Sequence, residues 1–150
     1  MAGVPKQNKT VMRFSDYRPL GLIFACDSSS NVSIMEISEL QSRLQIFAEE
    51  RDWDQFHSLK NLVLALVGEV GELAELLQWV DDSKIGEFLD SGGRVRLGDE
   101  VVDILLYLLR FADKAGLDIN AAVISKLKLN AEKYPIEKSK GSAKKYNELG

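Results

Sequence analysis

Cysteine is almost missing from this chain: its 150 residues include one, Cys26, so no disulfide can form within it. A single thiol is typical of proteins from a reducing compartment. No apolar run approaches the roughly 20 residues that span a membrane, so we expect no membrane partner. The length fits one domain, and 45% apolar residues can form a core without a disulfide or structural metal.

A basic stripe is also missing. The formal net charge is −4, and acidic and basic residues are mixed along most of the chain. Proteins that neutralise the phosphates of DNA or RNA cluster their lysines and arginines, so we expect no polymeric nucleic acid as a partner. A small phosphate compound remains compatible with this charge, because a bound metal ion can supply the positive charge that the protein lacks.

The first 32 residues lack a steady hydrophobic period and end in a polar cluster at 27–31, which predicts a flexible N-terminal extension. Residues 20–26 weakly resemble the apolar centre of a signal peptide, but Asp16 interrupts the basic residues before them. We therefore expect a cytoplasmic protein, with organelle import as the alternative. We expect the folded domain at residues 33–135, followed by an irregular tail rich in lysine and serine at 136–150.

The remaining pattern is helical. Apolar residues recur at three- and four-residue steps over 36–52, and Ser58 is a suitable N-cap for a helix that ends near Trp79. A long helix at 95–115 should end at Gly116, and turn formers before it surround a short helix at 85–89.

A fourth long helix is expected at 119–134, capped by Asp118 and stopped by Pro135. No strand-like alternation is long enough to predict a sheet. We therefore predict an all-α protein, a four- to five-helix bundle. Its two central helices, at 59–79 and 95–115, are apolar around their whole circumference and are expected to be buried.

Each central helix carries two acids within its most apolar stretch: Glu69 and Glu72 on one, and Glu100 and Asp103 on the other. A three-residue step places both members of a pair on one helix face. If the helices pack antiparallel, four carboxylates converge, and a bound cation would offset their repulsion and lost hydration. The alternative is that these acids are ordinary solvated charges on exposed faces. Glu75, one turn further, could support the site or face solvent.

The ligand types favour magnesium. No histidine or cysteine lies near these acids, which argues against zinc and copper, and no Asp/Asn/Gly-rich calcium loop is present. Magnesium commonly binds a few carboxylates together with substrate phosphates, which points towards phosphoryl chemistry.

At these residues the sequence resembles the MazG-like nucleotide pyrophosphohydrolases, which carry Glu-x-x-Glu followed by Glu-x-x-Asp. The likeness is greatest to their dCTP pyrophosphatase branch and covers about residues 36–149. The matching residues and segments are 50–57, 64–76, Trp79, Tyr107, 122–126, Tyr134-Pro135 and 141–146. Leu44 stands where close relatives carry a histidine, and the loop at 81–98 matches poorly.

The resemblance implies an all-α oligomer, usually a tetramer, that removes unwanted or modified deoxynucleotides. It implies hydrolysis of a nucleoside triphosphate between the α- and β-phosphates, which releases a monophosphate and pyrophosphate. The catalytic and metal-binding residues would be the four acids, Glu69, Glu72, Glu100 and Asp103, with Mg²⁺ as cofactor.

The resemblance also makes several aromatic and polar residues candidates for binding the nucleotide. Trp53 and Trp79 could sandwich the base, although each could instead seal one end of the core. His57 could hydrogen-bond the nucleotide or be a structural contact, and Tyr107 could support the sugar or belong to the core. On the last long helix, Lys126 and Asn130 could bind phosphate and share a face with Tyr134, or form part of a solvated basic stripe.

Two alternative functions remain open. The same scaffold could act on dUTP or on a broad range of triphosphates, because base specificity depends on polar contacts at the pocket edge. The chain could also be a non-catalytic helical interaction module whose acids bind a cation only for assembly.

Overall fold

The computed structural model describes residues 36–148, which form helices and turns and contain no strand. The all-α prediction is confirmed. The predicted N-terminal extension, with Cys26 and the apolar residues 20–26, lies outside the described residues. The chain divides after Ala115 into two compact units. The prediction of one domain at 33–135 stays a prediction.

In the first unit, helix α1 (Ile37–Glu49) buries Leu44 and Ala48. The chain then reverses through Asp52, whose φ of 54° lies in the left-handed region that Asp tolerates better than most residues. The backbone N–H of Trp53 donates a hydrogen bond to the carbonyl oxygen of Ala48, at 2.9 Å. This turn packs the Trp53 indole edge-on against Phe47, with ring centroids 5.7 Å apart, ahead of the 3₁₀ helix η2 (Asp54–Phe56).

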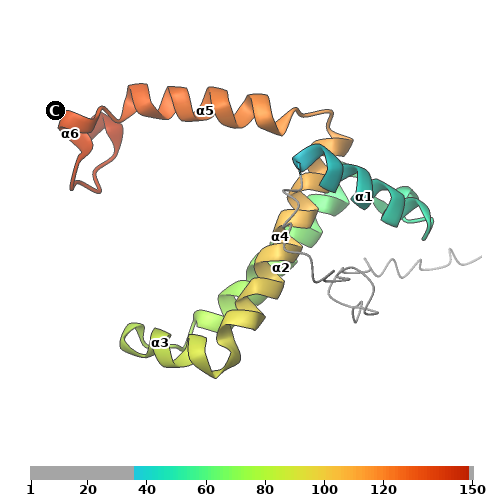
Figure 1. The fold of residues 1–150 in the computed structure, drawn as a ribbon, viewed down its shortest axis with the longest axis horizontal. Helices are drawn as coiled ribbons and strands as arrows, with labels where there is room; N and C mark the ends of the chain where they lie inside the picture. The colour runs from blue at the N-terminus through green and yellow to red at the C-terminus, as the bar shows by residue number, and fades with distance from the viewer. Residues whose placement is uncertain (1–35, 149–150) are drawn as a thin grey trace, which may run out of the picture. The chain divides into compact units, whose positions relative to one another are not determined.

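The two long helices of this unit are α2 (Leu59–Leu77) and α4 (Arg94–Lys114), and they lie side by side (Figure 1). The predicted Ser58 cap is confirmed, since its Oγ accepts a hydrogen bond from the N–H of Asn61 at 3.2 Å. Gly116 follows α4 with φ of 65°, as predicted for a helix C-terminus. Leu62 and Ala65 of α2 pack against Tyr107 of α4 in the core.

A compact connection returns the chain from α2 to α4. It contains the 3₁₀ helix η3 (Asp82–Lys84), helix α3 (Ile85–Phe88) and a π-type turn, η4 (Leu89–Gly93). The short helix predicted at 85–89 is therefore present. Gly92 has φ of 100°, and a Cβ on Gly93 would lie 2.5 Å from the Phe88 carbonyl oxygen, so this return needs glycine at both positions.

The prediction that both central helices are buried is wrong for a single chain. Each long helix packs along the other, and helix α1 contacts α4, so only part of their circumference is covered. Apolar side chains on the other faces are 42–62% exposed. These outward residues, here called the apolar outer faces, are Val63, Leu64, Val67 and Val70 on α2 and Val101, Val102, Leu105 and Leu108 on α4. A single chain therefore leaves the predicted bundle incomplete.

The second unit consists of helix α5 (Ile119–Lys133), helix α6 (Ile136–Ser139) and the 3₁₀ helix η5 (Tyr146–Glu148). The Asp118 side chain caps α5 and Pro135 follows its end, as predicted. The tail is more ordered than the irregular segment we expected. One reason is that Tyr146 packs back on Tyr134, with ring centroids 6.2 Å apart, and under the ammonium of Lys133.

None of the helices within residues 36–148 combines the length and the apolar character that a bilayer span requires.

Candidate metal centre and the adjoining pocket

Three of the four predicted acids meet between α2 and α4. Glu69 is fully buried, at 0% exposure, while Glu100 and Asp103 are partly buried. One carboxylate oxygen from each of the three lies within 4.8 Å of the others. Leu62 and Ala65 of α2 pack against Tyr107 of α4, whereas Glu69, further along α2, lies near Glu100 and Asp103, which are nearer the start of α4. The two helices are therefore antiparallel, as convergence of the acids required.

Glu72 lies beside this cluster rather than within it. It lines a groove with Glu100, and its negative charge acts on both Glu100 and Asp103. The structure thus gives a core of three acids, with the fourth one turn away on α2. Any cation held by the three would also feel the charge of Glu72.

The electrostatics of the cluster disfavour ionised carboxylates. Burial is the main cause that raises the pKa of Glu100, followed by the charges of Glu72 and Asp103. The pKa of Asp103 is raised by burial, then by Asp99 and Glu72. The buried Oε2 of Glu100 accepts no hydrogen bond from residues 36–148. A crowded, oxygen-only set of this kind fits a hard divalent cation better than zinc or copper.

The groove beside the cluster is about 500 Å³ and is lined by Gly68, Gly71, Glu72, Glu75, Leu76, Arg96 and Glu100. Gly68 and Gly71 border open space, because no atom beyond their chain neighbours and the helix's own backbone lies within 4 Å of the point where either would carry a Cβ. Arg96 brings a positive charge to the wall, and this charge acts on Glu100. The groove therefore has room and mixed charge beside the acids, and it contains Glu75, which we had left unassigned.

A second pocket, of about 290 Å³, lies nearer to α1 and is here called the aromatic pocket. It brings together three of the predicted binding residues: Trp53, His57 and Tyr107. Trp53 is 9% exposed and Tyr107 2%, so both residues also belong to the core. A place in the core was the alternative that the sequence left open for each of them. The other lining residues are Arg51, Asp52, Gln55, Phe56, Asn61, Leu62 and Ala65.

The aromatic pocket and the acid cluster are adjacent along both helices. Ala65 lines the pocket and Glu69 follows it by four residues, while Tyr107 lines the pocket and Asp103 precedes it by four. Four residues are about one helical turn, or roughly 6 Å along the axis. One ligand of nucleotide size can therefore reach both places.

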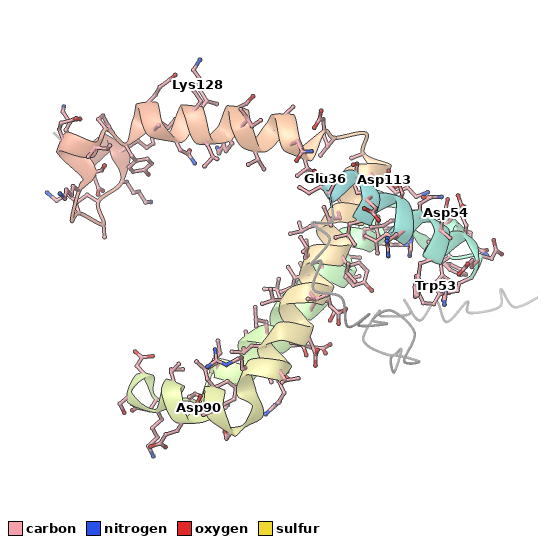
Figure 2. All side chains as sticks on the ribbon, in the orientation of Figure 1. Glu36, Trp53, Asp54, Asp90, Asp113 and Lys128 are labelled. Atoms are coloured by element: carbon pink, nitrogen blue, oxygen red, sulfur yellow. The ribbon has the colours of Figure 1, made fainter. Side chains whose placement is uncertain are left out.

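Trp79 is not in this pocket. It follows the C-terminus of α2 and is 88% exposed, and from Ala65 to Leu77 the helix rises by about 18 Å. Within one chain the two indoles are therefore not brought together, and their stacking on a base stays a prediction. Figure 2 shows Trp53 at the α1 end of the hairpin and Asp90, in the connection after Trp79, at the other end.

An arginine that we did not single out anchors the wall of the aromatic pocket. Arg110 on α4 is 1% exposed and its Nε donates to Nδ1 of His57 at 3.2 Å. The same guanidinium bonds Asp54, Asp113 and Gln45, and Lys114 bonds the other oxygen of Asp54 at 3.0 Å. The sequence does contain a signal for Arg110, because it is the one charged residue in the otherwise apolar run 104–112. The four acids were singled out by the same kind of signal.

The remaining predicted binding residues, Lys126, Asn130 and Tyr134, lie on α5 in the second unit. Lys126 and Asn130 are exposed, and Tyr134 is 39% exposed and contacts Tyr146. Their part in binding a nucleotide stays a prediction.

The fold and the acid cluster together define the class of protein. Two antiparallel helices bring three carboxylates together, and one of these carboxylates is fully buried. The MazG-like family model matches residues 65–149, and this chain belongs to the MazG-like family.

Among similar curated proteins, dCTP pyrophosphatase 1 of Rattus norvegicus is 50% identical over 104 residues, which is 69% of this chain and 61% of the relative. The Bos taurus protein of the same name is 45% identical over 122 residues, which is 81% of this chain and 70% of the relative. The chain thus spans about three fifths of the rat relative's length. A crystal structure of a pyrophosphatase from Archaeoglobus fulgidus superposes with a TM-score of 0.62 at 34% identity, over 66% of this chain and 92% of the other.

Proposed function

We propose that this protein hydrolyses a deoxynucleoside triphosphate, dCTP or a modified dCTP, to the monophosphate and pyrophosphate with Mg²⁺. The observation that carries the proposal is the buried Glu69, with a carboxylate oxygen within 4.8 Å of oxygens of Glu100 and Asp103, one helical turn from an aromatic pocket. The names of the relatives, dCTP pyrophosphatase 1 and a pyrophosphatase, support this choice of reaction and base. The role in the cell would be removal of unwanted nucleotides from the cytoplasmic pool.

In this proposal Glu69, Glu100 and Asp103 hold Mg²⁺, and Glu72 contributes from its place beside them. When bound, the cation neutralises phosphate charge and makes the phosphorus more open to attack. The aromatic pocket holds the base against Trp53, with His57 and Tyr107 in its wall. The phosphates then run along the hairpin towards the groove that contains Arg96.

The reaction forms one bond and breaks one. A water oxygen bonds to the α-phosphorus, and the bond from this phosphorus to the oxygen bridging to the β-phosphorus breaks. Pyrophosphate leaves with that oxygen, and the proton of the water passes to a carboxylate of the cluster.

We further propose that the active form is a homo-oligomer, with a tetramer favoured. The apolar outer faces would otherwise remain in water, and contiguous exposed apolar surface of this kind is typical of an interface. Trp79, which cannot reach the aromatic pocket of its own chain, could close the pocket of a second copy over the other face of the base. Lys126, Asn130 and Tyr134 on α5 would bind phosphates in the same assembly.

The test is dCTP turnover with and without Mg²⁺, with the products separated by anion-exchange chromatography. We expect dCMP and pyrophosphate, no free phosphate, and no reaction in EDTA. Glu69→Gln and Asp103→Asn should each lower kcat/KM by about 100-fold or more, since each removes a cation ligand. Glu87→Gln is the control, because Glu87 is an exposed acid on α3.

The same experiment separates the alternatives. Equal turnover of dUTP or other triphosphates would replace the dCTP preference with broad specificity. If no triphosphate is cleaved, and Glu69→Gln disrupts only assembly, the protein is a non-catalytic interaction module and the proposal fails.

A further inference from the structure

Arg110 carries a full charge where water barely reaches, because its side chain is 1% exposed. Every guanidinium nitrogen has a partner. Nε donates to Nδ1 of His57, Nη1 to Gln45 and to Asp113 at 2.6 Å, and Nη2 to Asp54. These partners come from α1, η2, the segment after η2 and α4, so one side chain joins four places in the first unit.

The bond to His57 fixes where the imidazole carries its proton. Arginine stays protonated in proteins and its guanidinium can only donate, so Nδ1 of His57 must be the acceptor. An imidazole whose Nδ1 accepts a hydrogen bond is neutral and bears its proton on Nε2. The alternative states, Nδ1-protonated or doubly protonated, would place two N–H groups against each other.

We propose that Arg110 is a positioning residue that holds His57, in the wall of the aromatic pocket, as a neutral imidazole protonated at Nε2. The ring then meets the pocket with a defined orientation and without positive charge. Asp54 and Asp113 hold the guanidinium in place from two sides, and Figure 2 shows both carboxylates at the α1 end of the hairpin. The consequence for nucleotide binding rests on the proposed function, but the state of the ring does not.

The charges around His57 agree with a neutral ring. Burial is the largest cause that lowers the pKa of His57, followed by the charge of Arg110; Asp54 raises it and Lys114 lowers it. Arg51 and Asp52 line the same pocket. A lowered pKa means that the neutral form persists to a lower pH than in an ordinary histidine.

The direct test uses the full chain and NMR, because His57 is its single histidine. In a two-bond ¹H–¹⁵N correlation spectrum at pH 7, we expect Nδ1 to show a pyridine-like shift and Nε2 a pyrrole-like one. A pyrrole-like Nδ1, or two nitrogens with the equal shifts of an imidazolium, would overturn the proposal without any variant.

Two substitutions at Arg110 separate its charge from its geometry. Arg110→Lys keeps the charge but lacks Nε–H, so the ring should become a mixture of tautomers while its pKa stays low. Arg110→Met removes both, so the pKa should rise as well. Lys114→Met is the matched control. It removes a neighbouring cation that does not bond His57, so it should raise the pKa and leave the tautomer unchanged.

Kinetics then connect this state to binding. We expect Arg110→Lys to raise KM for dCTP by about 3- to 10-fold, the equivalent of one lost hydrogen bond, with a smaller change in kcat. Circular dichroism confirms which variants fold. An unchanged tautomer in folded Arg110→Lys would overturn the positioning role. Absence of any dCTP turnover, with the expected tautomer in the wild type, would overturn the proposed function alone.

Discussion

Trp53 and Trp79, the two tryptophans of the chain, lie at opposite ends of helix α2, one 9% and the other 88% exposed. Trp53 is held against Phe47 and lines the aromatic pocket, while Trp79 projects beyond the helix terminus. Because α2 separates them, they cannot act together on one base within one chain. Any sandwich must combine Trp53 of one copy with Trp79 of another.

Replacing Trp79 with alanine should therefore affect binding more than folding. Its exposure predicts a change in the free energy of unfolding of the single chain within about 0.5 kcal/mol. If Trp79 stacks on the base, the loss of about 1–3 kcal/mol raises KM for dCTP about 5- to 150-fold. Steady-state kinetics and thermal unfolding measure both quantities. An unchanged KM would remove Trp79 from the binding site.

Trp53→Ala provides the contrast. This indole is buried against Phe47 and 6.4 Å from the His57 ring, so its removal leaves a cavity and should cost about 3 kcal/mol or more of stability. Urea unfolding monitored by circular dichroism tests this. A variant with unaltered stability would show that Trp53 is not part of the core.

If the proposed homo-oligomer forms through the apolar outer faces, a charge on one of these faces should break it. Leu64 is 60% exposed in one chain, and Leu64→Glu would place an unpaired carboxylate in an apolar interface. Sedimentation velocity should show a shift from oligomer to monomer. Ser38→Glu, on exposed surface of α1, is the control and should leave the oligomer intact. An intact Leu64→Glu oligomer would place the interface elsewhere.

The acid cluster should give an unusual dependence of stability on pH. The pKa values of Glu100 and Asp103 are raised in the folded state. Their contribution is therefore fully present below the ordinary carboxyl pKa, about 4, and is lost as the pH rises through the raised values. In EDTA, Tm of the wild type should fall over that range relative to Glu100→Gln/Asp103→Asn. Mg²⁺ should abolish the fall, because it binds the ionised carboxylates.

Thermal melts at several pH values, with EDTA and with Mg²⁺, give this comparison. If the wild type and the double variant follow the same curve in EDTA, the pKa values of Glu100 and Asp103 are not raised in the folded protein.

The Asp54 carboxylate should stabilise the folded state with the opposite dependence on pH. Its pKa is lowered, first by the hydrogen bond from Lys114 and then by the charge of Arg110. Its contribution is present above the unfolded pKa, about 3.9, and is lost as the pH falls through the lower folded value. Asp54→Asn should cost about 1–2 kcal/mol at pH 7, a modest value because the carboxylate is 39% exposed.

Urea unfolding at neutral and acid pH measures this cost, which should shrink at pH values below the folded pKa of Asp54. Asp90→Asn is the control, since its pair with Arg94 is 3.6 Å long and highly exposed. It should change the free energy of unfolding by at most about 0.5 kcal/mol. An equal effect of both substitutions would mean that Asp54 acts only as a surface charge.

Local pattern was enough to place the helices and their acids. The cap at Ser58, the stop at Gly116 and the three-residue steps of the acid pairs depend only on residues within a turn of each other. For the same reason, Glu69, Glu100 and Asp103 could be expected to meet once the helices were antiparallel.

Burial and long-range partners could not be read in this way. An all-round apolar helix indicates that each face has some partner, but not whether that partner is in the same chain, and here one hairpin leaves the outer faces exposed. Arg110 is separated along the sequence from His57 by 53 residues and from Asp54 by 56, yet it contacts both. Periodicity carries no information about such pairs, because the path of the connecting turns decides which side chains meet. The sequence by itself determined the helices and the charge they carry, while the tertiary structure decided which charges are buried together and which indole reaches the pocket.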